Sequence, residues 1–359
     1  MNLESLDWSA LERLRAAFLS GSAGKAAYWS SLSDLASYDA TFAERIGWKW
    51  DAVLAELSRV GWVPPAGMVY DFGCGSGIAG RRVLRAWGID RLTALRVSDR
   101  SPLAEEFATT AARGEFPGLD VARFDSGSAP AAGSGSTLVI SHVLNELPAA
   151  ARASLAEWIK RFDVVLWVEP GTHADSQALI EFRESLRSAF QVVAPCPHQG
   201  ICGLRTPGRE SDWCHFFAAP PPGIFADGNW VRFGQRMGID LRGLPYSYLV
   251  LDRRPAQSDE SCGAEGRGKP CESGEMEARL LGSPRFYKGF AKLFLCHSHG
   301  AGEVTFQKRV DPALFKRLER ERTGTWFRVQ VAGVHAKSLT DSLREADSSP
   351  DAASDTIVP

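Results

Sequence analysis

Several features that mark membrane or secreted proteins are missing from this sequence. No run of 18 apolar residues occurs in its 359 positions, so no segment is predicted to span a membrane. The N-terminus carries two early acids and no basic stretch, which predicts neither a signal peptide nor a transit peptide. We therefore expect a cytoplasmic protein without membrane contact, in which the seven cysteines are thiols or metal ligands rather than disulfides.

The net charge of −2 hides an uneven distribution along the chain. Residues 279–338 hold twelve bases against four acids, whereas residues 255–277 and 341–359 are each strongly acidic. A basic segment of this kind favours a polyanionic partner, although a solvated basic face is the alternative interpretation.

The segment Val69–Ala79 is predicted to form a buried strand, a glycine turn and the start of a helix. Gly73, Gly75 and Gly77 permit a sharp bend and a close approach of backbone to ligand, because they carry no Cβ. The spacing is not that of the dinucleotide fingerprint, and no P-loop lysine follows. The pattern, including Asp71, resembles motif I of class I S-adenosylmethionine (SAM) methyltransferases, which implies that these four residues bind the cofactor.

A second acid supports this interpretation. The next predicted strand ends at Asp99, 24 positions past Gly75, where folds of this kind place the ligand of the ribose hydroxyls. A role of Asp99 as a helix N-cap or turn residue is the alternative.

Strand and helix patterns alternate between residues 66 and 254, which predicts a mostly parallel, doubly wound α/β sheet. The resemblance to motif I implies that this sheet is of the Rossmann-like methyltransferase type. The predicted strands are Met68–Phe72, Leu92–Ser98, Thr137–Ser141, Val164–Glu169, Phe190–Ala194, Trp213–Ala218 and Tyr246–Leu251. The last two suit an antiparallel hairpin at the sheet edge.

The whole chain is predicted to divide into five segments. They are a helical cap at 1–62, a methyltransferase-like domain at 63–254, a flexible loop at 255–277, a small basic β-rich module at 278–338 and a disordered tail at 339–359. In the module we expect a hairpin from Leu293–His297 and Glu303–Lys308, a helix over Pro312–Arg322 and a strand over Trp326–Val331.

The residues after the fourth predicted sheet strand are candidates for catalysis. His142, Asn145 and Glu146 would line the reaction centre of a class I methyltransferase, and His142 or Glu146 could serve as a general base. Alternatively, Asn145 and Glu146 cap a helix that starts near Pro148. The Asn-Pro-Pro-Tyr motif of amino-group methylation is absent, and no cysteine lies here, so the sequence does not reveal the acceptor atom.

The cysteines form a second candidate site. Cys196, Cys202 and Cys214 fall within nineteen positions, which in a cytosolic protein favours a metal. The spacing is neither that of a zinc ribbon nor that of a ferredoxin, so zinc and iron–sulfur both stay open. His198 or His215 could be a fourth zinc ligand, and Cys296 a fourth thiolate.

Three motifs together resemble the Rsm22 family, which comprises bacterial Rsm22-like proteins and mitochondrial small-subunit assembly factors. They are Cys196-Pro-His-x-x-x-Cys202, Trp213-Cys-His-Phe216 and Leu244-Pro-Tyr-Ser-Tyr-Leu-Val-Leu251, behind the glycine turn. The similarity spans roughly residues 30–335. Gly203 stands where the family often has proline.

The resemblance implies a class I methyltransferase fold, association with the RNA of the small ribosomal subunit, and a [4Fe–4S] cluster. Matched position by position, the cluster ligands are Cys196, Cys202, Cys214 and Cys296. Basic residues would then face phosphates, with Trp326 as an exposed aromatic side chain. These basic residues are Arg232, Arg236, Lys308, Arg309, Lys316, Arg317, Arg320 and Arg322.

The function predicted from the sequence is that of a SAM-dependent methyltransferase acting on small-subunit rRNA or on a ribosome assembly intermediate, with a structural [4Fe–4S] cluster. The first alternative is a non-catalytic assembly factor that binds rRNA and retains the fold. The second is a small-molecule methyltransferase with a zinc site, against which the basic C-terminal module argues. A monomer is expected.

Overall fold

The computed structural model describes residues 3–20, 28–125, 127, 130, 133–255, 275–321, 326–332 and 335–341. The chain forms two compact units. The first contains Met1–Pro195 and Ser211–Ala256, and the second contains Cys196–Glu210 and Gln257–Pro359. The short segment Cys196–Glu210 therefore groups with residues far along the chain, a feature that a linear division of the sequence does not include. The predicted domain boundaries stay predictions.

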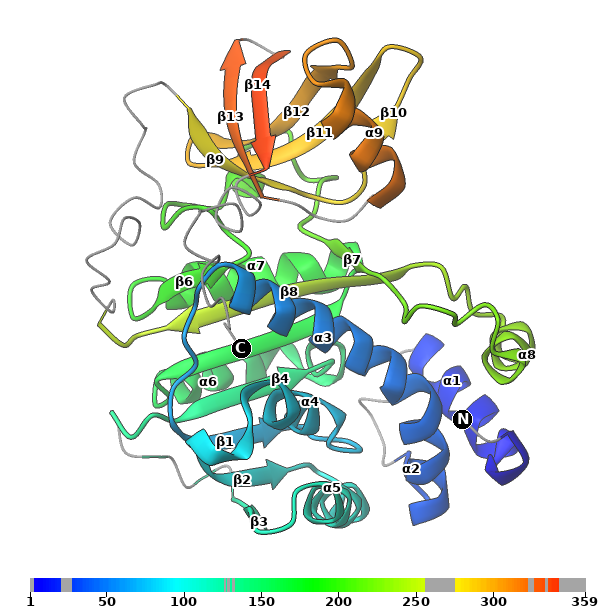
Figure 1. Ribbon diagram of the computed structural model, residues 1–359. Helices are drawn as coiled ribbons and strands as arrows, with labels where there is room; N and C mark the ends of the chain where they lie inside the picture. The colour runs from blue at the N-terminus through cyan, green and yellow to red at the C-terminus, as the bar shows by residue number, and fades with distance from the viewer. Residues whose placement is uncertain are drawn as a thin grey trace, which may run out of the picture. The chain divides into compact units, whose positions relative to one another are not determined.

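The first unit is built on a mixed eight-stranded sheet with the order β3-β2-β1-β4-β5-β8-β6, to which β7 adds by pairing with β8 (Figure 1). Its strands are β1 (Gly67–Phe72), β2 (Leu92–Ser98), β3 (Asp120–Arg123), β4 (Thr137–Ser141), β5 (Val164–Pro170), β6 (Gln191–Ala194), β7 (Phe216–Ala218) and β8 (Leu244–Asp252). The five strands β1 to β5 pair in parallel, and β8 runs antiparallel to both β5 and β6. Consecutive parallel strands connected by helices are typical of a doubly wound sheet.

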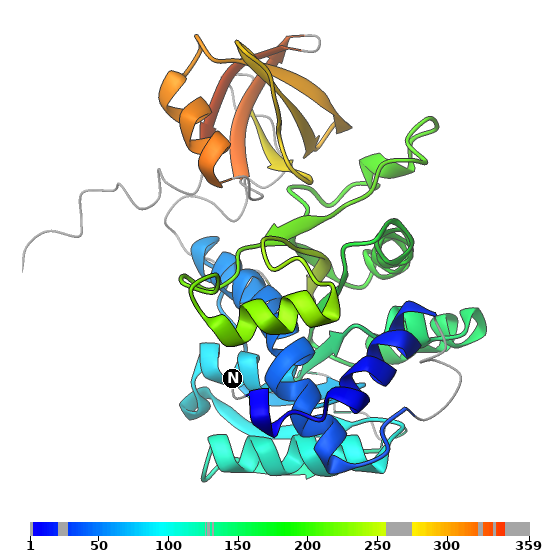
Figure 2. The same cartoon turned by 90° about the vertical axis from the view of Figure 1, so that its right-hand side faces the viewer.

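Helices cover both faces of this sheet, with α3 and α4 on one face and α6 and α7 on the other (Figures 1 and 2). The longer helices are α1 (Trp8–Leu19), α2 (Leu32–Tyr38), α3 (Glu44–Arg59), α4 (Ile78–Trp87), α5 (Pro102–Glu115), α6 (Ala149–Ile159), α7 (His173–Leu186) and α8 (Gly228–Met237). Short helical turns are η1 (Leu3–Ser5), the π-helical η2 (Asp39–Ala43), η3 (Ile89–Arg91), η4 (Leu144–Glu146) and η5 (Gly203–Arg205), the last of which belongs to the second unit.

The helices α1 to α3 form the predicted N-terminal cap, and local capping explains where they begin. Asp7 accepts from the Ala10 backbone N–H at the start of α1, and Ser31 accepts from the Asp34 N–H at the start of α2. Helix α3 buries Trp50, which is fully buried, and its buried side places α3 against α4 and β8.

The predicted fold class is confirmed: a doubly wound Rossmann-like sheet, an N-terminal helical cap and a separate, small β-rich module. Two details of the first unit's sheet differ from the sequence prediction. Strand β7 is only three residues long, because Trp213 and Cys214 precede it as a loop. The edge strand Asp120–Arg123 was not predicted, because it has only four residues and no strong apolar pattern.

The second unit contains β9 (Met276–Leu280), β10 (Arg285–Phe286), β11 (Phe290–His297), β12 (Gly300–Gln307), α9 (Pro312–Glu321), β13 (Trp326–Ala332) and β14 (His335–Asp341). Strand β9 pairs with both β11 and β13, so five of the strands close into a small barrel in the order β9-β11-β12-β14-β13. The β12–β14 pair is parallel, and the other pairs are antiparallel.

Inward side chains from these strands and α9 form the barrel core. Leu293, Phe306, Phe315 and Phe327 are all at most 1% exposed within it. Burial of aromatic and aliphatic side chains on this scale is the main source of stability in so small a unit. Among the described residues, no helix is both long and apolar enough to cross a bilayer.

Candidate functional site

The glycine turn joins β1 to α4 and lies at the carboxyl end of the parallel strands. Gly73 and Gly75 adopt φ values of +65° and +52°, which favour glycine. A Cβ on Gly73 would approach Val143 Cγ2 to 2.7 Å, whereas a Cβ on Gly75 would meet nothing within 4 Å. Gly73 is therefore required by packing against the turn after β4, and Gly75 by its backbone conformation beside an open space. The carboxyl edge of such a sheet is where open α/β folds bind ligands.

Asp71 lies beneath this turn rather than at its surface. Its side chain is fully buried, and its Oδ2 accepts from the Gly80 backbone N–H at 3.0 Å. Burial raises the pKa of Asp71 to about 7. The carboxylate thus fixes the first turn of α4 to the end of β1. A direct contact of Asp71 with a cofactor, which the sequence predicts, stays a prediction.

Asp99 follows β2 and connects the two strand ends. Its Oδ2 accepts from the Gly75 N–H at 3.0 Å, and its Oδ1 accepts from the Ser101 N–H at 2.9 Å. Burial raises the pKa of Asp99, although these two backbone donors act in the opposite direction. The carboxylate therefore also holds the glycine turn in place, in addition to the ligand role expected from the sequence.

These groups open onto a cavity of about 1010 Å³ in the first unit. Its volume lies at the upper end of the range of about 300–1,000 Å³ that is usual for cofactor and small-molecule sites. One part is lined by the glycine turn, Asp99 and Arg100, and another by the cap helices and the residues after β4 and β5. Aromatic side chains of the cap line much of it: Phe18, Tyr28, Trp29, Tyr38 and Phe42.

The loop after β4 has an unusual backbone that places His142 in the cavity wall. His142 has φ +56°, which is uncommon for a residue other than glycine and is often found at functional sites. The fully buried Glu169 holds the loop, since its Oε1 accepts from the backbone N–H groups of Val143 at 3.0 Å and Leu144 at 3.2 Å. Trp167 Nε1 donates to the same oxygen at 2.7 Å. Burial raises the pKa of Glu169 to about 8.

Lys49 of α3 is a residue that the sequence analysis missed. Its Nζ lies 3.2 Å from His142 Nε2, and both side chains line the cavity. Burial, together with the positive charge of Arg45, lowers the pKa of Lys49 to about 8, and burial lowers the pKa of His142 well below its usual value. The only sequence signal was a lysine between two tryptophans on an amphipathic helix, and such a lysine is usually solvated.

The hydrogen bonds determine where the protons lie at neutral pH. An ammonium group has donors only, so His142 Nε2 accepts from Lys49, and the neutral imidazole carries its proton on Nδ1. The Nδ1–H then donates to Ser141 Oγ, which lies 3.3 Å away. Trp50 Nε1 donates to the same hydroxyl oxygen at 3.0 Å. The pair of Lys49 and His142 therefore shares one positive charge inside an aromatic-lined cavity.

Glu146 and Asn145 also line the cavity, as expected, but in different settings. Glu146 accepts from the Tyr28 hydroxyl at 3.2 Å and forms an ion pair of 3.3 Å with Arg100. Burial raises the pKa of Glu146, against the charge of Arg100, which lowers it. Asn145 is exposed, and neither residue caps α6, whose N-cap is Pro148 without a side-chain hydrogen bond.

The predicted metal ligands are divided between the two units. Cys196, Cys202 and Cys296 belong to the second unit and Cys214 to the first. Within the second unit, Cys296 Sγ lies 3.8 Å from His198 Nε2. No group of three or more histidine, cysteine, aspartate or glutamate side chains that could hold a metal occurs in the part of the chain that the structure describes. The iron–sulfur ligand set of Cys196, Cys202, Cys214 and Cys296 therefore stays a prediction.

Two of the predicted RNA-binding side chains have other contacts. Trp326 is only 3% exposed, so its interpretation as an exposed aromatic side chain was wrong; its hydrophobic surface is buried in the barrel, with Arg279 over its ring. Arg236 pairs with Glu12 at 3.1 Å and lies over the ring of Trp8. Arg322 lies outside the described residues.

The strand order with an antiparallel β8 between β5 and β6, the glycine turn and the cavity at the carboxyl edge define the class I methyltransferase fold. The chain belongs to the Rsm22 family, described as mitochondrial small ribosomal subunit Rsm22, whose sequence pattern matches residues 42–328. No curated protein matches the chain in a sequence comparison.

Solved structures similar to this chain include three methyltransferases. A SAM-dependent methyltransferase from Leishmania major shares 14% identity, with 68% of this chain and 82% of that one covered and a TM-score of 0.35. One from Aquifex aeolicus shares 13% identity over 40% and 82%, with a TM-score of 0.31. Geranyl diphosphate C-methyltransferase from Streptomyces coelicolor shares 13% identity over 57% and 79%, with a TM-score of 0.32. At these scores the fold assignment rests on the strand order, not on the likeness.

Proposed function

We propose that this protein binds SAM and acts in the assembly of the small ribosomal subunit, as a methyltransferase of its rRNA. The observation that carries the proposal is one cavity that joins the glycine turn and Asp99 to the pair of Lys49 and His142. Family membership supports the ribosomal partner. The predicted cytoplasmic location stays a prediction, since the family description is mitochondrial.

The residues around the cavity fit SAM in shape and charge. Gly75 leaves open space at the turn, and Asp99, which lines the same cavity, would accept from the ribose hydroxyl groups. When bound, SAM supplies an electrophilic methyl group on a sulfonium centre. The aromatic wall of the cap excludes water, which strengthens the electrostatic effect of each charged group in the cavity.

The pair of Lys49 and His142 is the proposed proton acceptor. Methylation of a nitrogen or oxygen atom of the acceptor would release a proton, which a base in the cavity would have to take up. Neutral Lys49 Nζ takes this proton, with His142 Nε2 beside it at 3.2 Å. Because the pKa of Lys49 is about 8, the competent form grows as the pH rises through 8. Glu146 and Asn145 position the acceptor.

Two measurements test this proposal. Calorimetry should show SAM binding to the purified protein and its loss in Asp99→Ala. Tritiated SAM with small-subunit precursors should then label the rRNA, with a rate that rises between about pH 7 and pH 9. Protein that binds no SAM would contradict the proposal outright. SAM binding without label in any precursor would instead favour the alternative function.

That alternative is a non-catalytic assembly factor, and one observation favours it. At neutral pH, Lys49 occupies the accepting nitrogen of His142, and Glu146 is engaged by Arg100 and Tyr28. Each candidate base is thus already bonded. In that case the cavity serves to bind SAM as a sensor or stabiliser, and the RNA contact carries the function.

We also propose, from the cysteine motif and the family resemblance, a [4Fe–4S] cluster on Cys196, Cys202, Cys214 and Cys296. Thiolates suit iron–sulfur clusters and zinc alike. No catalytic step depends on the cluster here. Anaerobic purification should give a brown protein with about four irons per chain, and Cys296→Ser should lose them, whereas Cys74→Ser should not. A colourless protein with one zinc would overturn the cluster.

A further inference from the structure

The barrel of the second unit has a strand connectivity that points to a ligand. Numbered within the barrel, β9, β11, β12, β13 and β14 are its first to fifth strands, and α9 connects the third to the fourth. The first strand pairs with the second and the fourth, and the third pairs with the fifth in parallel. This is the arrangement of the OB-fold, a five-stranded barrel that binds oligonucleotides on the face of its second and third strands and on the loop between the first two.

Fold alone does not establish function, so the proposal depends on what that face carries. The outward side chains of β11 and β12 pair across the strands as Phe290 with Gln307 and Lys292 with Thr305. Their neighbours Ala291 and Phe306 point into the core and are fully buried. The outer face is therefore distinct from the core in composition.

One half of this face is covered within the same unit. A Cβ on Gly203 would meet the Ala301 backbone nitrogen at 2.5 Å, and Arg209 lies over the ring of Phe294. The segment Cys196–Glu210 thus packs along the end of the β11–β12 hairpin. The open half is the end that carries Phe290, Lys292 and the preceding loop.

That open end carries a stacked pair of aromatic rings. The Tyr287 and Phe290 rings lie 4.6 Å apart with an interplanar angle of 11°, and Tyr287 is 45% exposed. Two backbone hydrogen bonds fix the platform, from Tyr287 N to Phe290 O at 2.8 Å and from Lys308 N to Gly289 O at 3.0 Å. An exposed ring that is already held flat is suited to stack on an unpaired base.

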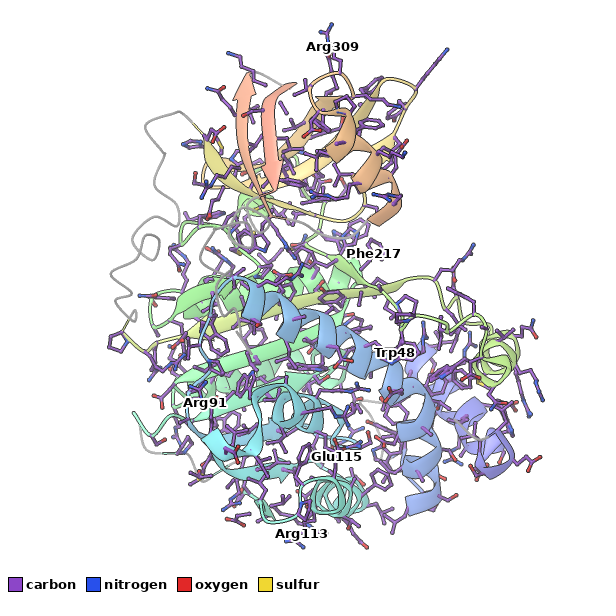
Figure 3. All side chains as sticks on the ribbon, viewed as in Figure 1. Trp48, Arg91, Arg113, Glu115, Phe217 and Arg309 are labelled. Carbon is purple, nitrogen blue, oxygen red and sulfur yellow. The ribbon has the colours of Figure 1, made fainter. Side chains whose placement is uncertain are left out.

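Basic residues are frequent in the segments that carry and adjoin the ring pair. They are Arg285, Lys288 and Lys292 around Tyr287 and Phe290, and Lys308 and Arg309 after the partner strand β12, with Lys308 over the ring of Phe315. The single acid on the adjoining strand face is Glu303, which forms ion pairs with Arg285 and with Lys292, the latter at 2.7 Å. Arg309 projects outward from the module (Figure 3). Charge of this sign beside a stacking platform is complementary to a phosphate backbone.

We propose that this platform is a binding site for single-stranded RNA, in which Tyr287 stacks on an unpaired base and Lys288 and Arg309 contact the flanking phosphates. The inference extends the proposed ribosomal function by assigning the RNA contact to one surface, but it requires neither SAM binding nor methyl transfer. A duplex offers no exposed base face, so the site discriminates against it.

The test is fluorescence anisotropy of the full-length protein with a labelled 12-nucleotide uridine RNA, measured without SAM. Tyr287→Ala should weaken binding at least about fivefold, because base stacking on an aromatic ring is worth about 1–3 kcal/mol. Tyr287→Phe should bind as the wild type does, since it keeps the ring. Phe225→Ala is the matched control, because Phe225 is a large exposed aromatic in the first unit.

Salt dependence tests the phosphate contacts. Lys288→Ala and Arg309→Ala should each reduce the slope of log K against log salt by about 0.7, as expected for one lost phosphate contact on a single strand. Arg59→Ala, at an exposed base in the last turn of α3 in the first unit, should leave the slope unchanged.

Three results would overturn the inference. They are RNA binding that Tyr287→Ala leaves unchanged, equal affinity for a duplex, and no measurable binding of the oligonucleotide. The last two would indicate that the platform takes a different partner, such as a protein. These experiments do not measure methylation. Their results would therefore still test the RNA site if the protein proved not to be a methyltransferase.

Discussion

The two units of this chain build their candidate sites in opposite ways. In the first, a parallel sheet gathers loops at one edge, and buried polar groups such as Asp71 and Glu169 hold those loops around a cavity. In the second, a closed and mostly antiparallel barrel has an apolar core and presents its candidate site on an outer face. Ligand binding in a cavity lined by buried charged groups should depend on pH and on the positions of single atoms. Ligand binding on an outer face should depend on the salt concentration.

The comparison also concerns the cost of substitution. A buried carboxyl group with a raised pKa lowers the stability of the folded protein when it ionises. Such groups occur often at functional sites, where they hold the geometry. Exposed side chains such as Tyr287 can be replaced with little effect on folding. Substitutions around the cavity of the first unit should therefore change ligand binding and stability together. Substitutions on the barrel face should change ligand binding without changing stability.

The largest expected effect is a loss of stability in the second unit alone. Phe315→Ala should lower the free energy of unfolding of the barrel by about 3–5 kcal/mol, because it removes a buried ring that packs on Phe286 and Phe306. Hydrogen-exchange mass spectrometry should show lost protection in β9 to β14 and retained protection in β1 to β5. Phe162→Ala, in the core of the first unit, should give the reverse pattern. Equal loss of protection in both units for both variants would show that the two units do not unfold separately.

A second substitution tests the cavity directly. Gly75→Val should weaken SAM binding by about 100-fold, or ~2.7 kcal/mol, since it places a branched side chain at a positive φ and in the open space of the turn. Gly61→Val is the matched control, because Gly61 has φ +70° and also no atom within 4 Å of its Cβ. Calorimetry should find normal SAM affinity in the control. Equal weakening in both variants would attribute the effect to backbone strain.

A third prediction concerns pH and Glu169. Its pKa rises from 4.5 to about 8 on folding, so between these values the folded state binds the proton more tightly than the unfolded state. Stability from this group is therefore present below about pH 4.5 and is lost as the pH rises toward 8, by at most ~1.4 kcal/mol per pH unit.

Glu169→Gln should remove this slope, because the amide retains the accepting oxygen for Val143 and Leu144 and cannot ionise. Urea unfolding of both proteins at several pH values between 5 and 8 measures it. Parallel curves for the variant and the wild type would show that Glu169 is not the titrating group.

The smallest expected effect concerns Lys49. Its pKa falls from 10.5 to about 8 on folding, so between these values the unfolded state holds more protons and stability from this group rises with pH. Lys49→Met should raise the stability at pH 7 by roughly 1 kcal/mol and remove the rise above pH 8. Lys160→Met, at the residue that follows helix α6, should change neither. An unchanged pH profile in Lys49→Met would show that Lys49 titrates normally.

Much of the first unit was predictable from the sequence. Strands Leu92–Ser98 and Thr137–Ser141 were placed at their observed bounds, because continuous apolar runs between turn residues are typical of buried parallel strands. The glycine turn and Asp99 were found by the same local logic. Lys49 was not, because its partner His142 lies 93 positions away and no local pattern connects a helix of the cap to a strand end.

The second unit was less predictable. A hairpin, a helix and a strand were expected there, but barrel closure depends on β9 pairing with two distant strands. The alternation of Trp326 with its neighbours did not reveal which face is inward, and the ring is buried. Strand registers of this kind depend on neighbours that are remote in sequence.

The sequence by itself determined most elements of the first unit, the glycine turn and the distribution of charge, because these depend on residues within a few positions of one another. Tertiary structure alone decided which groups share an environment: Lys49 with His142, Glu169 with the loop after β4, and Tyr287 with Phe290 on a barrel face. The physical reason is that burial and electrostatic coupling act through space. Lys49 is a candidate proton acceptor, and Tyr287 a candidate stacking platform, only because folding places His142 beside the one and Phe290 beside the other.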